Sequence, residues 1–182
     1  MQVTKTKLND VLIFEPKVFG DERGFFMETF RHDFFTQQTG AKQLVQDNHS
    51  KSSQGILRGL HYQLEHTQGK LVRVTQGSVF DVAVDLRQSS STFGEWVGIN
   101  LSAQDNRQLW IPEGFAHGFY VTSDTAEFVY KCTDYYDPQS EVSISWEDLD
   151  LSIQWPLVNG QPPTLSGKDT DGQCFINAPK FD

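Results

Sequence analysis

Short apolar or alternating runs recur along the whole sequence, with turn-forming residues between them. Runs this short that are rich in Val, Ile, Phe, Tyr and Trp are typical of β-strands rather than helices. The predicted strands are Val11 to Phe14, Gly24 to Phe30, Leu44 to Asp47, Ile56 to Gln63, Leu71 to Thr75, Val79 to Leu86, Trp96 to Leu101, Gln108 to Ile111, Gly118 to Thr122, Ala126 to Thr133 and Val142 to Trp146. Turn residues fill Asp21 to Gly24, Thr75 to Ser78 and Pro112 to Gly114. The pattern predicts a mainly β fold, a jelly roll or a related double-sheet β-barrel.

Helical patterns are weak in this sequence. Arg31 to Thr39 is predicted to form two helical turns that end at Gly40, and Trp146 to Leu151 one more turn. From Gln154 to Asp182 the chain is rich in Pro, Gly and Asp, which indicates an irregular segment laid over the barrel. We therefore expect residues 1–182 to form a single jelly-roll domain with a few short helices.

Composition and charge exclude several classes of protein. The chain has 182 residues, 37% hydrophobic and 21% charged, which fits one globular domain with a substantial core. A formal net charge of -9 disfavours binding to nucleic acids or to anionic membranes. The amino terminus lacks an apolar signal region, and no run approaches the ~18 apolar residues that a membrane span needs. We expect a soluble cytoplasmic protein.

Two segments have the spacing of a metal site whose ligands are partly replaced. Their residues are Gly55, His61, Gln63, Lys70 and Gly77 in the first segment, and Pro112 to His117 in the second. This spacing resembles the two sequence boxes of the cupin family, in which a second His and a Glu complete the metal ligands. Here Gln63 replaces that His and Lys70 replaces that Glu, so a divalent cation at His61 and His117 would face an ammonium. We expect a cupin-like barrel that holds no metal at this position.

Period-two alternation places Leu57, Gly59, His61 and Gln63 on one face of their strand. A barrel interior with His and Gln is polar, which favours a ligand cavity. An isolated buried His is more commonly a hydrogen-bonded structural group. His117 recurs at the matching position of the second segment, so we predict that both imidazoles face one pocket.

Positive charges gather near the first segment of this acidic chain. Solvated surface charges are the better interpretation of Lys51 and Arg73. For Arg58 and Lys70 a phosphate or carbonyl partner is at least as favoured, because Arg presents a planar fork and Lys a movable point charge. Tyr130 contributes to chemistry only if it points inside the barrel. A pocket with His, Lys and Tyr suits proton transfer next to a carbonyl, which is the chemistry of epimerisation.

Six linked motifs carry a more specific resemblance. They are Phe19 to Phe26, Gln46 to Ser50, Leu57 to His61, Gln68 to Arg73, Ile111 to Phe119 and Leu165 to Asp169. In this order they cover nearly the whole chain, which resembles the dTDP-4-dehydrorhamnose 3,5-epimerase family. The resemblance implies a cofactor-free enzyme of dTDP-L-rhamnose biosynthesis. Its substrate would be dTDP-4-dehydro-6-deoxy-D-glucose, converted to dTDP-4-dehydro-L-rhamnose through an enolate.

The resemblance also assigns roles to residues. His61 matches the general base, Asp169 the carboxylate that orients it, Tyr130 the proton donor on the opposite face and Lys70 the cation beside the 4-keto oxygen. Matches to substrate contacts are Arg23, Phe26, Glu28, Gln46, Asp47, Asn48, Arg58, His117, Tyr136, Glu141 and Lys168. Among these, Glu28 matches a contact to thymine and Tyr136 the aromatic that stacks on it. The resemblance implies a homodimer in which Arg23, Phe26 and Glu28 complete the site of the neighbouring subunit.

Three alternatives remain open at this point. One is an epimerase of the same fold that inverts only C3 or only C5 of a related dTDP-4-ketosugar. Another is a metal-dependent cupin oxygenase or isomerase, against which Gln63 and Lys70 argue. The third is a non-catalytic sugar-binding barrel.

Overall fold

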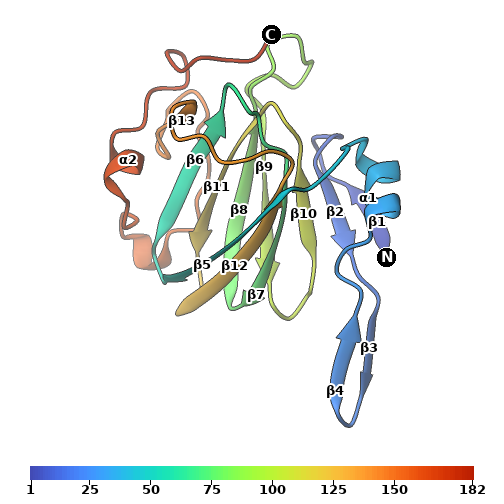
Figure 1. Ribbon diagram of the computed structural model, residues 1–182. Coiled ribbons are helices and arrows are strands. Elements are labelled where there is room, and N and C mark those ends of the chain that lie inside the picture. Colours follow the sequence, from blue (N-terminus) through green and yellow to red (C-terminus); the bar gives the residue numbers. More distant parts are fainter.

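The computed structural model describes residues 1–182 and is mainly β (Figure 1). Its strands are β1 (Gln2–Lys5), β2 (Leu12–Glu15), β3 (Val18–Asp21), β4 (Gly24–Met27), β5 (Gln46–Ser53), β6 (Leu57–Gln63), β7 (Lys70–Gln76), β8 (Ser78–Asp85), β9 (Trp96–Ser102), β10 (Gln108–Ile111), β11 (Phe115–Val121), β12 (Thr125–Cys132) and β13 (Glu141–Ser143). The helices are α1 (His32–Thr39), the short 3-10 turn η1 (Val158–Gly160) and α2 (Gly167–Thr170).

The strands form two antiparallel sheets and a separate hairpin. The first sheet has six strands in the order β1-β2-β10-β7-β12-β5, and the second has five in the order β13-β6-β11-β8-β9. The largest core cluster draws buried side chains from both sheets, among them Val72 of β7, Phe128 of β12, Ala83 of β8 and Phe119 of β11. The two sheets therefore face each other as a double-sheet barrel, as the sequence pattern predicts.

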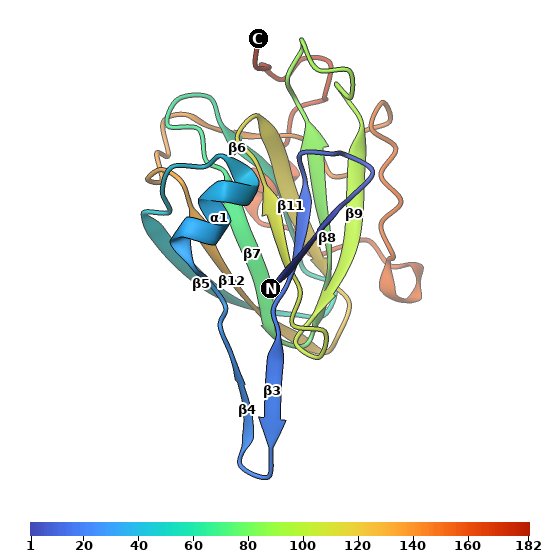
Figure 2. The same ribbon diagram turned by 90° about the vertical axis from the view of Figure 1, so that its right-hand side faces the viewer.

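A second cluster lies on the outer face of the five-stranded sheet. Val82 and Val84 of that sheet share this cluster with Ala178 of the carboxy-terminal segment, and the half-buried Trp155 and Phe175 of the same segment pack against it. Figures 1 and 2 both place this segment along that face, and it carries α2. Because the central strands are covered on both sides, all seven residues of β11 are buried. Side chains of this segment thus cover the outer face of the five-stranded sheet.

Helix α1 covers part of the outer face of the six-stranded sheet. Phe35 packs edge-on against Trp110, with ring centroids 5.0 Å apart. The helix ends where predicted, because Gly40 adopts a left-handed φ of 73° and its N–H bonds the carbonyl of Thr36.

Most predicted strands are confirmed, and the differences have physical reasons. β5 runs from Gln46 to Ser53, whereas only Leu44 to Asp47 was predicted, because its sequence is polar on both faces and carries no hydrophobic period. β1 and β3 were not predicted, β4 ends at Met27, β11 begins at Phe115 and β13 ends at Ser143. The α2 and η1 helices were also missed.

The predicted helix from Trp146 to Leu151 is wrong. This stretch forms turns, since the Asp148 carboxylate accepts the backbone N–H groups of Asp150 and Leu151, both at 3.0 Å. A side chain that binds nearby backbone donors in this way competes with the helical hydrogen bonds.

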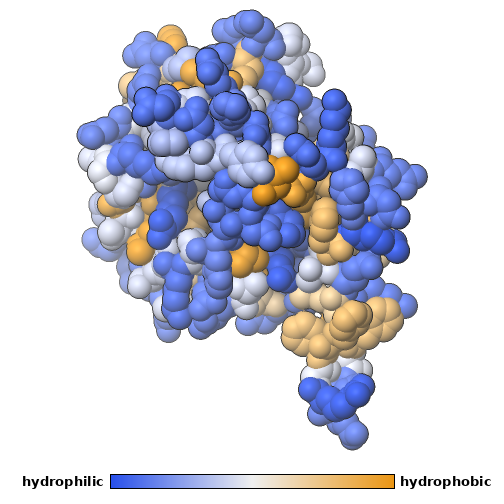
Figure 3. Space-filling model, in the orientation of Figure 1, coloured by the Kyte–Doolittle hydropathy of each residue, from blue (hydrophilic) through white to orange (hydrophobic).

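The β3–β4 hairpin projects from the barrel as an arm (Figures 1 and 2). Its side chains Phe19, Phe25 and Phe26 are 54%, 66% and 71% exposed. Figure 3 shows this apolar surface between the body and a polar tip. None of the helices combines the length and the apolar character that crossing a membrane requires.

Candidate active site

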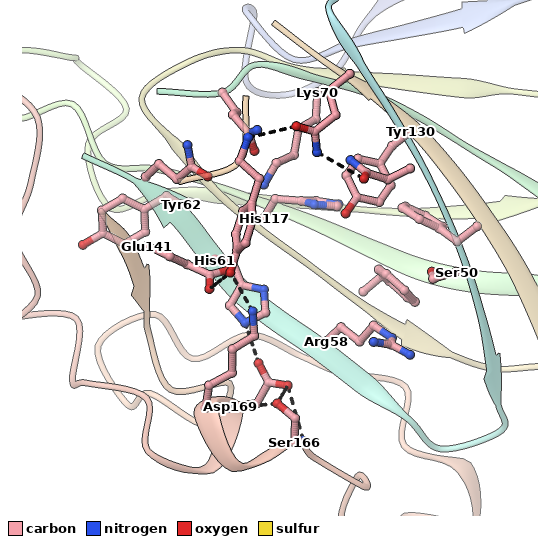
Figure 4. A pocket seen from close by; sticks show the side chains of 18 residues that line it. Ser50, Arg58, His61, Tyr62, Lys70, His117, Tyr130, Glu141, Ser166 and Asp169 are labelled. Atoms are coloured by element: carbon pink, nitrogen blue, oxygen red, sulfur yellow. Dashed lines mark hydrogen bonds and ion pairs between the residues drawn. The ribbon is translucent and has the colours of Figure 1, made fainter. Parts of the chain in front are cut away.

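A cavity of about 360 Å³ opens between the two sheets beside α2 (Figure 4). Eleven predicted site residues line it, namely Gln46, Asn48, Arg58, His61, Lys70, His117, Tyr130, Tyr136, Glu141, Lys168 and Asp169. The four predicted catalytic side chains thus share one cavity, together with seven of the eleven predicted substrate contacts.

A bulge in β6 brings Arg58 and His61 to the same cavity. His61 pairs with His117, and Arg58 pairs with Phe119. Between these two pairs β6 advances by three residues and β11 by only two, which is a β-bulge. This corrects the predicted alternation, which placed Arg58 on the face opposite His61. The strands approach closely here, since a Cβ on Gly59 would lie 2.5 Å from the Cα of Gly118.

His61 and Asp169 form a buried pair at the floor of the cavity. The Nε2 atom of His61 lies 2.5 Å from Oδ1 of Asp169, whose residue is only 3% exposed. Burial raises the pKa of the Asp169 carboxyl, but hydrogen bonds from His61 and Ser166 outweigh it and bring the pKa down to about 2. The charged carboxylate therefore accepts the proton of Nε2, which leaves the lone pair on Nδ1.

The imidazole of His61 is suited to accept a proton. Burial lowers the pKa of His61 and outweighs the opposing hydrogen bond to Asp169. The side chain is consequently neutral at pH 7 and can act as a base through Nδ1. The competing interpretation, a hydrogen-bonded structural histidine, does not account for this free nitrogen.

Lys70 and Tyr130 supply the other two reactive groups of the cavity. The Nζ atom of Lys70 has no hydrogen-bond or ion-pair partner, and burial lowers the pKa of this ammonium. Tyr130 faces inward beside Phe128, with ring centroids 6.0 Å apart. Burial raises the pKa of Tyr130 to about 12, so the phenol keeps its proton at neutral pH.

His117 belongs to a second buried pair, with Asp81 of β8. Its Nε2 atom lies 3.0 Å from both carboxylate oxygens of Asp81, which is fully buried. Burial raises the pKa of Asp81, and His117 opposes this rise. Sequence reasoning missed Asp81, although an acidic residue inside a buried apolar strand signals a partner, because an unpaired buried charge is costly.

A chain of polar contacts lines one side of the cavity. The hydroxyl of Tyr136 donates to Oε2 of Glu141 at 2.9 Å, and Nζ of Lys168 donates to Oε1 at 2.8 Å. Burial raises the pKa of Glu141, but these two contacts bring it below its usual value. Glu141 is therefore charged and joins β13 to α2 and to the loop after β12.

Gln63 has become a structural residue. Its amide donates to the carbonyls of His66 and Tyr135, at 2.7 and 3.2 Å, and accepts the N–H of Asp137 at 3.0 Å. These bonds fix the loop that carries Tyr136. No group of three or more His, Cys, Asp or Glu side chains is placed to hold a metal ion.

Four predicted substrate contacts lie outside the cavity. Asp47 is on the opposite face of β5, where Lys131 bonds its carboxylate at 2.8 Å. Arg23 and Phe26 belong to the arm, and Glu28 follows it. Sequence reasoning missed six cavity residues, Ser50, Tyr62, Gln68, Phe119, Phe128 and Ser166. Alternation along Gln46, Asn48 and Ser50 would have indicated the first of them.

Comparisons with known proteins agree with this geometry. Residues 5–177 match the family model described as dTDP-4-dehydrorhamnose 3,5-epimerase. A protein of that name from Shigella flexneri is 62% identical over 183 residues, which cover 100% of this chain and 99% of that protein.

Solved structures extend the comparison to a bound sugar nucleotide. A dTDP-6-deoxy-D-glucose-3,5-epimerase from Legionella pneumophila, in complex with dTDP-4-keto-L-rhamnose, aligns with a TM-score of 0.94 at 52% identity, covering 98% of this chain and 94% of that chain. A 3'-monoepimerase from Streptomyces bikiniensis, in complex with dTDP-quinovose, aligns at 0.88 with 32% identity, covering 94% and 87%. The match over nearly the full length, at high identity to the 3,5-epimerases, establishes that the chain belongs to the dTDP-4-dehydrorhamnose 3,5-epimerase family.

Proposed function

We propose that the chain catalyses epimerisation at C3 and C5 of dTDP-4-dehydro-6-deoxy-D-glucose, giving dTDP-4-dehydro-L-rhamnose. The observation that carries this proposal is the buried His61–Asp169 pair, which shares one cavity with the phenol of Tyr130 and the unpaired ammonium of Lys70. These groups are a base, an acid and a cation, which epimerisation next to a ketone requires.

The reaction proceeds in two proton transfers at each carbon. Nδ1 of His61 removes the proton next to the 4-keto group, and the electron pair of the broken C–H bond forms the enolate. The ammonium of Lys70 donates to the enolate oxygen and stabilises its charge. Tyr130 then delivers a proton to the opposite face of the carbon, which inverts it. Exchange with solvent removes the proton from His61 and returns one to Tyr130 before the second carbon reacts. Each of these acid–base roles contributes roughly 10²–10⁴-fold to the rate.

The remaining cavity residues would hold the nucleotide. Ser52 accepts the Nε proton of Arg58 at 3.1 Å, which leaves the terminal nitrogens of Arg58 available for phosphate oxygens. Tyr136 would stack on thymine, and the other contacts would come from Gln46, Asn48, His117, Glu141 and Lys168. Asp47 stays a predicted contact that lies outside the cavity of its own chain.

We further propose a cytoplasmic homodimer of single-domain subunits, which supplies rhamnose for a surface polysaccharide such as an O-antigen. The exposed apolar arm supports the dimer, since large apolar patches of this kind commonly mark interfaces. In this arrangement Arg23, Phe26 and Glu28 of each arm reach the cavity of the other subunit.

Deuterium incorporation tests the reaction. The purified protein is incubated with the 4-keto substrate in deuterated water, and NMR follows the hydrogens at C3 and C5. Label at both carbons is expected, and His61→Ala or Tyr130→Phe should slow both exchanges by roughly 10²-fold or more. Label at one carbon only would mean that the protein is a monoepimerase. No label at either carbon would mean that it is a non-catalytic sugar-binding barrel.

Complementation between subunits tests the arm. A chain with His61→Ala is mixed and refolded with a chain that carries Arg23→Ala and Phe26→Ala, each of which is expected to be inactive alone. A mixed dimer has one cavity with an intact base and an intact arm from its neighbour, so about a quarter of all sites should recover. Mixtures that stay inactive although mixed dimers form would contradict the exchanged arm.

A further inference from the structure

We propose that Ser166 is a positioning residue of the general base, because its hydroxyl holds the Asp169 carboxylate in line with His61. The inference rests on the proposed function, in which His61 is the base. Ser166 borders the cavity at the amino-terminal end of α2 (Figure 4).

The contacts of Asp169 divide between its two oxygens. Oδ1 accepts from Nε2 of His61 at 2.5 Å and from the N–H of Gly59 at 3.2 Å. Oδ2 accepts from the hydroxyl of Ser166 at 2.6 Å and, more weakly, from its N–H at 3.4 Å. The Ser166 hydroxyl is therefore the only short contact that fixes Oδ2, and with it the rotation of the carboxylate.

Removing this hydroxyl has two consequences for the base. Oδ2 would lose its one short donor inside a residue that is only 3% exposed, and an unsatisfied buried acceptor is costly. The carboxylate would also turn more freely, so the hydrogen bond that selects the Nε2 proton of His61 would be held less firmly. The first effect destabilises the carboxylate, and the second loosens the orientation of the base. The Ser166 hydroxyl also accepts the N–H of Asp169 at 3.4 Å as the N-cap of α2, so its removal takes one contact from the start of this helix as well.

The surrounding backbone keeps the segment in place without Ser166. On one side the carbonyl of Thr164 accepts the N–H of Leu57 in β6 at 3.1 Å, and the N–H of Thr164 donates to the carbonyl of Gly55, just before β6, at 2.8 Å. On the other side Gln173 exchanges bonds of 2.9 Å with Ser143 and Ser145. A serine-to-alanine variant should consequently fold, and its effect should be local.

Three variants separate positioning from a general loss of structure. Ser166→Ala removes the hydroxyl, and Ser166→Thr keeps it. Thr170→Ala is the matched control, because the Thr170 hydroxyl bonds the Ser166 carbonyl at 3.0 Å in the same short helix but does not touch Asp169. Asp169, Lys168 and Glu141 are the charged groups that act on His61, and all three remain in each variant.

The Ser166→Ala substitution should change kcat much more than KM. Ser166→Ala is expected to lower kcat for deuterium exchange by about tenfold, the size of one hydrogen bond to a charged group, and to change KM by less than about twofold. The acid limb of its pH profile should move to higher pH, because a carboxylate with one donor fewer accepts the Nε2 proton of His61 more strongly and so favours the protonated imidazole. Ser166→Thr should restore both values, and Thr170→Ala should resemble the wild type.

The opposite pattern would overturn the proposal. A raised KM with kcat and the acid limb unchanged would make Ser166 a substrate contact, and an equal loss in Thr170→Ala would make it a structural residue. NMR titration of His61 in the free protein gives a readout that needs no turnover. If the wild type exchanges no deuterium, the proposed function fails, and the titration still decides whether Ser166 governs the His61–Asp169 pair.

Discussion

Lys70→Met should change stability and activity in opposite directions. The ammonium of Lys70 has no hydrogen-bond or ion-pair partner, and burial lowers its pKa, so the folded protein holds a poorly solvated charge. Methionine has a similar length and no charge. Lys70 is half-buried beside the cavity, so replacing its partly desolvated ammonium should raise the free energy of unfolding by about 1 kcal/mol at pH 7.

The pH dependence of this gain follows from the sign of the shift. Because the folded pKa of Lys70 lies below its usual value of 10.5, the unfolded chain binds more protons between these two values. The wild type therefore recovers stability as pH rises through this window, and the advantage of Lys70→Met should shrink toward pH 10.5. Below the folded pKa the full penalty is present.

The activity of Lys70→Met should fall although its stability rises. Removing one preorganised group beside a developing oxyanion costs roughly 10²–10³-fold in kcat, or about 3–4 kcal/mol of barrier. Deuterium exchange into the 4-keto sugar measures the fall in activity. Urea unfolding at pH 7 and pH 10 measures the gain in stability.

Lys51→Met is the control for charge alone. Lys51 is 63% exposed and pairs with Glu127 on the outer face, so both quantities should stay close to the wild type. A Lys70→Met protein that is less stable at pH 7, or that exchanges deuterium within tenfold of the wild type, would refute the reasoning.

Three other substitutions, with one control, probe the cavity, the close contact between β6 and β11, and the packing of α1. Tyr130→Phe should keep its fold and lose roughly 10²–10⁴-fold in exchange rate, and a wild-type rate would remove the phenol from the mechanism. Gly59→Ala should destabilise by about 1–3 kcal/mol in urea unfolding, since its Cβ would lie 2.5 Å from Gly118, whereas Gly167→Ala meets nothing within 4 Å and should change stability by less than about 1 kcal/mol. Phe35→Ala should cost about 3–5 kcal/mol by the same measurement, because Phe35 is buried against Trp110, and a smaller loss would mean that α1 closes over the gap.

The sequence predicted the barrel where strands carry a hydrophobic period. β10 was predicted from Gln108 to Ile111 and has these bounds, because its four residues are all buried between apolar neighbours. β5 carries no such signal, since its inward side chains Gln46, Asn48 and Ser50 line a polar cavity. The strand that is hardest to predict is thus the one that builds a wall of the site.

The proposed catalytic constellation could be predicted only in part from residue types. His61, Lys70 and Tyr130 lie on strands whose neighbourhood suggested a pocket, but Asp169 lies 108 positions beyond His61 on a four-residue helix. No local pattern joins residues this far apart, and the pairing depends on how the carboxy-terminal segment packs on β6. Its prediction rested on the family resemblance.

The two altered positions of the metal-like pattern have taken different roles. The Gln63 amide is bound by the backbone of two loops, so this side chain shapes the wall of the cavity. The Lys70 ammonium has no hydrogen-bond or ion-pair partner and faces the cavity. The two remaining histidines have changed as well, because His61 and His117 each direct Nε2 to a buried carboxylate, Asp169 and Asp81. Such carboxylates orient each imidazole, and in the proposed function Nδ1 of His61 is the atom that accepts the proton. The four positions that match metal ligands in the cupin pattern therefore hold two oriented imidazoles, one structural amide at Gln63 and one cation at Lys70.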